Sequence, residues 1–199
     1  MKNILHIITS PRGKESISIK LGNALVNEVL QTHPGSTVTE LNLAEHPLPH
    51  LDEATVNALR TPVDQHTELQ KEVIKASDAA IAQLFDADIL VIGVPLYNFG
   101  VPSNLKSWLD HVLRAGKTFS YTAEGPKGLA AGKKVYLAFS SGGVYSEGPA
   151  TGLDFATPYL TAVLGFIGIQ DVSVIRAEGL AIPGLKENAF DKALASIEV

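Results

Sequence analysis

Short apolar runs alternate with amphipathic segments along the whole chain. The runs Asn3–Thr9, Asp88–Val94, Val135–Ser140 and Asp171–Ala177 are typical of buried strands, and Thr37–Leu43 alternates polar and apolar residues as a half-buried strand does. The strand Asp88–Val94 is almost entirely apolar, which predicts a central position in the sheet. Strands that alternate with helices along the sequence indicate βαβ units and a parallel sheet.

Helical periodicity fills the segments between these strands. A stripe from Ile17 through Leu21, Ala24, Leu25 and Val29 predicts a helix that ends before Pro34-Gly35. Further helices are predicted over Leu69–Leu84 (with Leu69, Val73, Ala76, Ala80 and Leu84 on one face), from Pro102 to a stop at Gly116, over Pro158–Ile167 and over Glu187–Ile197.

Five strands with short connections to their helices match a flavodoxin-like fold. We therefore expect a three-layer α/β sandwich around a five-stranded parallel sheet of order 2-1-3-4-5, with residues 1–199 forming a single domain. In this topology a ligand lies at the carboxyl edge of the sheet, between the loops that follow the first and third strands.

Two segments are longer than the bare fold requires. Ala44–Gln65 contains three prolines and a predicted short helix near Glu53–Leu59, and Lys117–Lys133 contains a Phe119/Tyr121 alternation followed by Gly125-Pro126 that suggests a small hairpin. Long insertions in a compact domain are usually lids or contact surfaces.

Composition excludes several classes of function. The chain of 199 residues has 45% hydrophobic residues and a net charge of −5 without charge runs, so no basic stripe indicates nucleic acid or an anionic membrane as a partner. It has no cysteine, which excludes disulfides, thiolate nucleophiles and cysteine-ligated metals, and we predict no metal site. No apolar run is long enough for a signal peptide or membrane span, and we expect a cytoplasmic protein.

The loop after the first strand has the features of a phosphate site. Ser10, Ser16 and Ser18 supply hydroxyl donors just ahead of the first predicted helix, where free backbone amides and a partial positive charge favour an anion. Arg12 and Lys14 add attraction at longer range. The alternative is that Ser16 or Ser18 only caps the helix. A receiver-domain function is excluded, because no acidic cluster follows this strand.

The loops after the third and fourth strands offer a wall for a planar ring. Pro95, Leu96, Tyr97, Asn98 and Phe99 form a proline-bounded aromatic segment, and Ser140, Ser141, Gly142, Gly143 and Tyr145 follow the fourth strand. The alternatives are core aromatics and an ordinary glycine turn. With the phosphate loop, these loops suggest a site for flavin mononucleotide (FMN), with donors from Gly142-Gly143 facing the pyrimidine edge.

Longer motifs resemble one enzyme family. The segment Pro95–Phe99 with Pro102, Leu105-Lys106 and Asp110, then Arg114–Phe119, Tyr121, Gly125-Pro126 and Gly128-Leu129, is similar to the FMN-dependent NADH azoreductases, which are also NADH:quinone oxidoreductases. Thr9–Arg12 with Ser16–Ser18, and Gly142–Tyr145, resemble two further motifs of that family. Many members have methionine where this chain has Leu96 and arginine where it has Ser141.

The resemblance implies residue roles. Ser10 and the turn Ser16, Ile17, Ser18 would hold the FMN phosphate and ribityl chain, Leu96–Phe99 would line the isoalloxazine, and Ser140–Gly143 would contact its pyrimidine side. It also implies a homodimer with active sites at the subunit interface, for which Ala44–Gln65 and the hairpin near Tyr121 are the natural surfaces.

We therefore expect an FMN-dependent oxidoreductase that takes electrons from NADH or NADPH and reduces quinones and azo compounds by two-electron ping-pong transfer. The flavin carries the chemistry, so no catalytic side chain is predicted. Phe99 and Tyr121 are expected to frame the substrate, and His111 to be structural rather than a proton donor. The alternatives are a flavodoxin-type carrier without direct NADH oxidation, and a nucleotide-binding protein that has lost its flavin.

Overall fold

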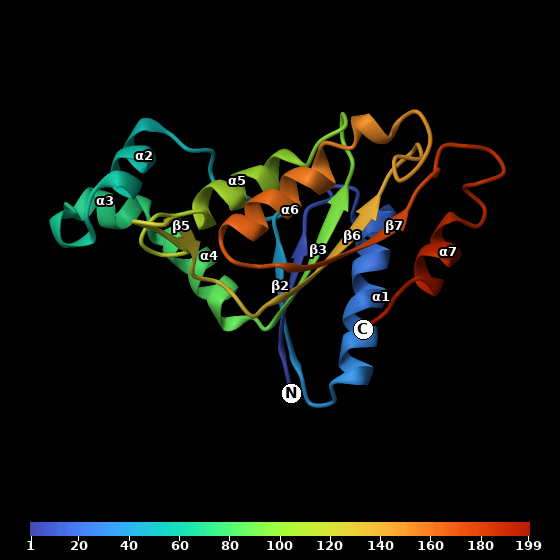
Figure 1. The fold of residues 1–199 in the computed structure, drawn as a ribbon, viewed down its shortest axis with the longest axis horizontal. Coiled ribbons are helices and arrows are strands. Elements are labelled where there is room, and N and C mark those ends of the chain that lie inside the picture. Colours follow the sequence, from blue (N-terminus) through green and yellow to red (C-terminus); the bar gives the residue numbers. More distant parts are fainter.

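A parallel sheet organises the chain, which a computed structural model describes over residues 1–199. Its five strands are β1 (Asn3–Ile8), β2 (Thr37–Asn42), β3 (Ile89–Pro95), β6 (Lys134–Ser140) and β7 (Asp171–Ala177). Their spatial order is β2-β1-β3-β6-β7 and every pairing is parallel, which confirms the predicted fold and strand order (Figure 1). The carboxyl ends of all five strands therefore lie at one edge.

Burial along the strands follows their position in the sheet. Every residue of β3 is buried, because helices cover both of its faces, whereas β2 at the sheet edge is largely exposed. The register pairs Leu90 with Leu5 on one side and with Val135 on the other. A continuous apolar layer thus runs across the three central strands and fixes where their loops emerge.

Helices cover both faces of the sheet and divide the core into two clusters. One face packs against α1 (Ile17–Thr32) and α7 (Ala189–Ala195), and the other against α4 (Lys75–Asp86), α5 (Ser103–Val112) and α6 (Ala156–Phe166) (Figure 1). Trp108 of α5 and Phe139 of β6 are among the largest fully buried side chains of the second cluster. None of the helices is both long and apolar enough to cross a membrane.

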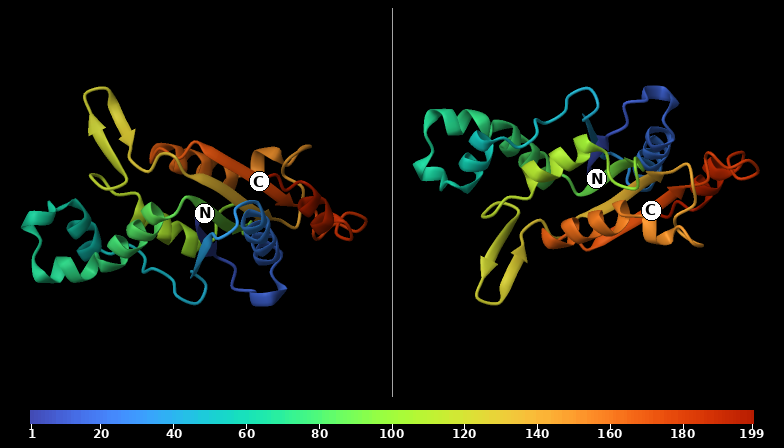
Figure 2. Two further views of the ribbon diagram at one scale, coloured as in Figure 1. Left: turned by 90° about the horizontal axis from the view of Figure 1, so that it is seen from below. Right: turned by 90° about the horizontal axis from the view of Figure 1, so that it is seen from above.

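The two insertions project from this sandwich. The first contains α2 (Glu53–Arg60) and the 3-10 turn η2 (Val63–Gln65), which form an arm together with the following α3 (Glu68–Val73). The second forms a hairpin of β4 (Phe119–Thr122) and β5 (Gly125–Gly128). Both views of Figure 2 show the arm and the hairpin extending away from the sheet. The predicted short helix and the predicted hairpin are thus present. Two further 3-10 turns, η1 (Gly13–Glu15) and η3 (Thr151–Leu153), lie in loops.

The helix predicted over Leu69–Leu84 differs from the structure. A capping box between Thr67 and Gln70 starts α3, which packs against α2, and a new helix begins after Ile74. Leu69, placed on the buried stripe by periodicity, is 68% exposed. The buried side of α4 instead consists of Ser77, Ala80, Ile81 and Leu84. The helical period was correct within α4, but the break at Ile74 shifted the face.

One buried histidine sits between β1 and α1 without a hydrogen-bond partner. His6 is 2% exposed, and its Nε2 lies against the backbone of Gly22, where an added Cβ would be 2.7 Å away. Burial lowers the pKa of His6 to about 4. The folded protein therefore holds this ring neutral at a pH where the unfolded chain protonates it.

We predict that His6 makes the fold acid-sensitive. Its contribution is constant above its unfolded pKa of 6.5 and is lost as the pH falls from there towards about 4. The loss should approach about 3 kcal/mol of unfolding free energy. Urea unfolding between pH 7 and 4 should show this component in the wild type and lack it in His6→Leu, whereas His46→Leu, at an exposed position, should retain it. Equal pH profiles for wild type and His6→Leu would contradict the assignment.

Candidate functional site

Three loops meet at the carboxyl edge of β1, β3 and β6. The first joins β1 to α1, the second joins β3 to α5, and the third follows β6. Several hydrogen bonds tie them together. Thr9 Oγ1 donates to the carbonyl of Gly93 at 2.6 Å, Asn104 Nδ2 donates to the carbonyl of Thr9 at 2.9 Å, and the Leu96 amide donates to the carbonyl of Ser140 at 2.8 Å.

The amino end of α1 leaves its backbone donors free. Ser16 is the N-cap residue, but its side chain makes no capping bond; its Oγ lies 3.0 Å from Ser18 Oγ instead. The amides of Ile17, Ser18 and Ile19 have no hydrogen-bond partner within the chain. The alternative of a simple serine cap is therefore wrong for Ser16. Paired hydroxyls beside free helix-terminal amides form a cradle for an anion.

The second loop holds two residues in strained backbone conformations. Tyr97 and Gly100 bond to each other through both backbone groups, and the turn between them places Asn98 at φ 50° and Phe99 at φ 68°. Two consecutive residues in the left-handed conformation make a tight two-residue turn. Asparagine tolerates this backbone conformation, whereas phenylalanine rarely adopts it. The turn leaves Phe99 42% exposed. Tyr97 faces the first loop, with its hydroxyl 3.4 Å from Ser10 Oγ.

Backbone bonds hold the third loop against the loop after β7 and leave two of its own amides without a partner. The carbonyls of Ser141, Gly142 and Gly143 accept bonds from the loop after β7, and Ser141 Oγ donates to the Gly143 carbonyl at 2.8 Å. The amides of Gly142 and Gly143 have no partner. A Cβ at Gly143 would lie 3.2 Å from the Tyr145 ring, so glycine lets that ring pack against the loop.

A cavity of about 210 Å³ lies where the loops converge. The predicted residues that line it are Ser16, Ile17, Pro95, Leu96, Tyr97, Ser140, Ser141 and Gly142. Arg12 also lines it, and so do Leu180 and Ala181, which the sequence analysis did not select. The last two follow β7, and their amides bond to the carbonyls of Ser141 and Gly142. The topological rule for ligand position gave no reason to select a loop after the fifth strand.

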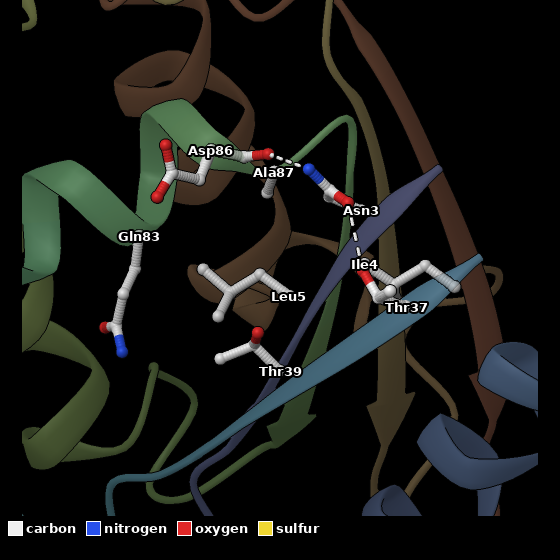
Figure 3. A pocket seen from close by; sticks show the side chains of 8 residues that line it. All are labelled: Asn3, Ile4, Leu5, Thr37, Thr39, Gln83, Asp86 and Ala87. Carbon is white, nitrogen blue, oxygen red and sulfur yellow. Dashed lines mark hydrogen bonds between the residues drawn. The ribbon is translucent and has the colours of Figure 1, made fainter. Parts of the chain in front are cut away.

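A second cavity, of about 250 Å³, lies at the opposite edge of the sheet. Figure 3 shows Asn3 at its rim. The side-chain Nδ2 of Asn3 donates to the Asp86 carbonyl at 3.1 Å, and its Oδ1 accepts from Thr37 Oγ1 at 2.9 Å. Leu5 and Ile4 line it as well. It shares no lining residue with the cavity at the three loops.

Comparison with known proteins agrees with this geometry. Residues 2–199 match a family described by its flavodoxin-like fold. The FMN-dependent NADH:quinone oxidoreductase of Herminiimonas arsenicoxydans is 48% identical over 195 residues, covering 98% of this chain and 94% of that protein. The chain belongs to this flavodoxin-like oxidoreductase family. The family resemblance seen in the sequence motifs is thereby confirmed.

Solved structures show the same similarity in three dimensions. An azoreductase from Bacillus anthracis str. Sterne superposes with a TM-score of 0.90 at 33% identity, with 98% of this chain and 96% of that chain covered. A second, an FMN-dependent NADH-azoreductase from Bacillus anthracis str. Ames Ancestor in complex with FMN, gives a TM-score of 0.86 at 27% identity, covering 98% and 97% of the two chains.

The two departures from the family motifs occupy defined places. Leu96 is half-buried on the cavity wall, and Ser141 is buried with its hydroxyl closing the third loop. A charged side chain is therefore absent at position 141, and the loop is held by a neutral hydrogen bond.

Several predicted or considered residues lie outside the cavity. They are Ser10, Ser18, Asn98, Phe99, Gly143 and Tyr145. Ser18 Oγ bonds to Ser16, and Ser10 Oγ lies 3.4 Å from the Tyr97 hydroxyl, so each touches a residue of the lining. The Tyr145 ring lies against Gly143, and its centroid is 6.2 Å from that of Phe99. Tyr121 is elsewhere: it is 74% exposed on the hairpin, which packs against the far end of α6 through Phe119 and Phe166. One chain alone does not bring Tyr121 to the site.

Two residues of α5 have structural partners. His111 is fully buried, with Nε2 2.9 Å from the Pro49 carbonyl, which agrees with its predicted structural role. Lys106 Nζ lies 2.6 Å from Asp110 Oδ1, and this bond raises the pKa of Lys106. Lys106 is therefore engaged along its own helix.

We predict that Ser10→Ala and Ser18→Ala weaken FMN binding while the fold remains intact. Ser18 has a buried hydroxyl at the amino end of α1 and Ser10 has one just after β1, and neither substitution removes much packing volume. A hydrogen bond to a charged phosphate oxygen contributes about 1–3 kcal/mol, so affinity should fall roughly five- to a hundredfold. Fluorescence titration of FMN into apoprotein provides the measurement. Ser36→Ala, near the opposite end of α1, is the matched control and should leave affinity unchanged.

Proposed function

We propose that this protein is an FMN-dependent NADH:quinone oxidoreductase that also reduces azo compounds, built as one FMN-binding domain over residues 1–199. The observation that carries the proposal is the pairing of unsatisfied donors at one edge. Ile17 at the amino end of α1 and Gly142 in the third loop, whose backbone amides have no partner, line the same cavity. An elongated ligand with an anionic end and a planar, electron-poor ring matches both sets.

The residues present fit FMN. Ser10, Ser16 and Ser18 with the helix amides would hold the phosphate, and Pro95–Phe99 would lie along the ring. Three residues of that segment, Pro95, Leu96 and Tyr97, line the cavity. The amides of Gly142 and Gly143 would donate to its pyrimidine side. Arg12 is the cation that lines the cavity, so the dianion would meet a positive charge as well as backbone dipoles.

When bound, FMN supplies two-electron chemistry between a reduced nicotinamide and a quinone or azo acceptor. The protein supplies orientation and electrostatics. The amides of Gly142 and Gly143, which have no partner in the chain, would stabilise negative charge on a ring edge placed against them. Exposed Phe99 and the neighbouring Tyr145 provide an apolar surface on which a planar substrate can lie. The chain needs no nucleophile for this reaction.

A turnover assay distinguishes the proposed oxidoreductase from the two alternatives, a flavodoxin-type carrier and a protein that has lost its flavin. Purified protein supplied with FMN should oxidise NADH rapidly when a benzoquinone is present, and NADPH in place of NADH measures the coenzyme preference. A flavodoxin-type carrier would bind FMN and show its visible spectrum without NADH oxidation. A protein that has lost its flavin would remain colourless after FMN is added. Either of these results would contradict the proposed function, and the 48% identical relative named as an NADH:quinone oxidoreductase supports the enzyme.

We further propose that the active unit is a homodimer. Apolar side chains are exposed on both insertions, including Leu51 and Val63 on the arm segment and Tyr121 and Leu129 on the hairpin segment. A single sandwich leaves the Phe99 side of the site open, and a second copy related by a twofold axis would place its hairpin or arm against that side. Tyr121 would then frame the substrate in the partner's site, consistent with its place far from the site of its own chain.

We predict that disrupting the arm separates FMN binding from catalysis. Arg60→Glu combined with Val63→Glu should yield monomers by sedimentation, because both side chains belong to the projecting arm. The monomer should retain much of its FMN affinity, since the phosphate cradle lies within one chain, yet lose most quinone reduction as the substrate slot opens to water. The control is Glu28→Lys, a charge reversal at an exposed position of α1. A monomer with full turnover would overturn the shared site.

A further inference from the structure

An ion-pair network lies directly behind the third loop. Arg176, near the carboxyl end of β7, donates from Nη2 to Asp154 Oδ2 and to Thr157 Oγ1, each at 2.8 Å. Its Nη1 lies 3.4 Å from Glu178 Oε1. The guanidinium also stacks over the ring of Phe139 in β6, 4.4 Å from the centroid. Planar stacking with several directed N–H bonds is a geometry that arginine provides and lysine does not.

The network reaches the third loop through one backbone bond. Glu178 Oε1 accepts the amide of Tyr145 at 2.8 Å, and the Glu178 side chain is only 9% exposed. Tyr145 in turn packs edge-on against Phe99 and against the space above Gly143. Glu178 therefore sets the backbone position from which the Tyr145 ring extends over Gly143.

The same network also reaches the second loop. Asp154 Oδ1 accepts the amide of Thr157 at 2.9 Å at the start of α6, and the amide of the intervening Phe155 donates to the carbonyl of strained Phe99 at 3.1 Å. Asp154 is held between Arg176 and α6. The position of Phe99 is thus coupled to Arg176 through Asp154 and Phe155, and the position of Tyr145 is coupled to Arg176 through Glu178.

Arg176 is the only cation bonded to these two buried carboxylates. Burial alone would raise the pKa of Asp154, but hydrogen bonds from Thr157 and Arg176 outweigh it and hold the pKa below its usual value. Removing the guanidinium would leave two carboxylates poorly solvated and without their shared partner. We therefore expect the segments they anchor to loosen.

We infer that Arg176 is a positioning residue, which acts through Glu178 and Asp154 to hold Tyr145, Gly143 and Phe99 in the arrangement that receives the flavin ring. The inference rests on the proposed FMN site and adds residues that do not line its cavity. It applies to the apoprotein as well as to the FMN-loaded enzyme, because every contact in the network is between protein groups.

The chain offers a matched control for this network. Lys134 and Asp171 form an ion pair at 2.5 Å between the same two strands, β6 and β7, at their opposite ends, and Lys134 Nζ lies 5.2 Å from the centroid of the Tyr136 ring. Lys134→Met therefore removes a cross-strand cation above an aromatic ring, as Arg176→Met does, but far from the loops. If only Arg176→Met changes FMN binding, the effect comes from the position of Arg176 beside the loops and not from the loss of an ion pair as such.

The experiment compares variants by three measurements. These are FMN affinity by fluorescence titration, the midpoint potential of the bound flavin, and hydrogen–deuterium exchange of residues 140–155 in the apoprotein. Arg176→Met should weaken FMN binding about tenfold or more, shift the potential, and speed exchange in this segment, with Arg176→Lys intermediate. Glu178→Ala should act like Arg176→Met. Glu178→Gln retains an acceptor for the Tyr145 amide, so its exchange and affinity should stay within about threefold of the wild type.

The outcomes separate the inference from its alternatives. Unchanged affinity and exchange in both Arg176→Met and Glu178→Ala, with only a lower melting temperature, would overturn the positioning role, as would an equal loss of affinity in Lys134→Met. If Arg176→Met does not fold, the Glu178 pair carries the same comparison with the Arg176–Asp154 bond intact. Wild-type protein that fails to bind FMN would overturn the proposed function and this inference together, whereas normal wild-type binding with unaffected variants would overturn the inference alone.

Discussion

The close packing of α1 against the sheet determines where the site can be. His6 and Gly22 touch without room for a side chain, and on β3 a Cβ at Gly93 would contact both the Ile7 carbonyl and Ser18. Helix α1 therefore packs closely on β1, where Gly22 leaves room for the His6 ring, and also on β3 and β6. Because the strands are parallel and in fixed register, the amino end of α1 then lies beside the loops that follow β3 and β6. The helix dipole, the serine hydroxyls and the ring-binding loops share one edge for this reason.

The strands and the site loops could be predicted because each leaves a local signal. Strands buried on both faces are continuous apolar runs, and β3 and β7 begin or end within a residue of their predicted bounds. Serines before a helix and glycines after a strand are also local features. The break at Ile74 could not be predicted from periodicity, since it depends on α3 packing against α2 rather than on the sheet. Leu180 and Ala181 were missed for a related reason: only the backbone bonds of the folded chain bring them to the cavity.

Side-chain networks between residues far apart in the chain could not be predicted from the sequence. Arg176 and Asp154 are 22 positions apart, and neither stands in a recognisable motif. Their bond exists because β7 pairs with β6 and α6 starts beside the end of β7. Tyr121 shows the converse. The sequence showed its motif, but its position is set by the hairpin, whose base packs on α6 while Tyr121 stays exposed away from the site (Figure 2). Within its own chain Tyr121 packs edge-on against Phe119, with ring centroids 5.6 Å apart.

The site combines free backbone donors with a strained turn. Helix-terminal amides and the Gly142 and Gly143 amides have no partner within the chain, and Phe99 adopts a left-handed backbone conformation. That conformation costs free energy, which the surrounding packing must offset. A ligand that satisfies these donors binds the folded state alone and so stabilises it. The network behind the third loop has the complementary property: Arg176, Glu178 and Asp154 satisfy one another without a ligand. These ion pairs hold the second and third loops in place, so the free backbone amides keep their positions. The site can therefore receive its cofactor with little rearrangement.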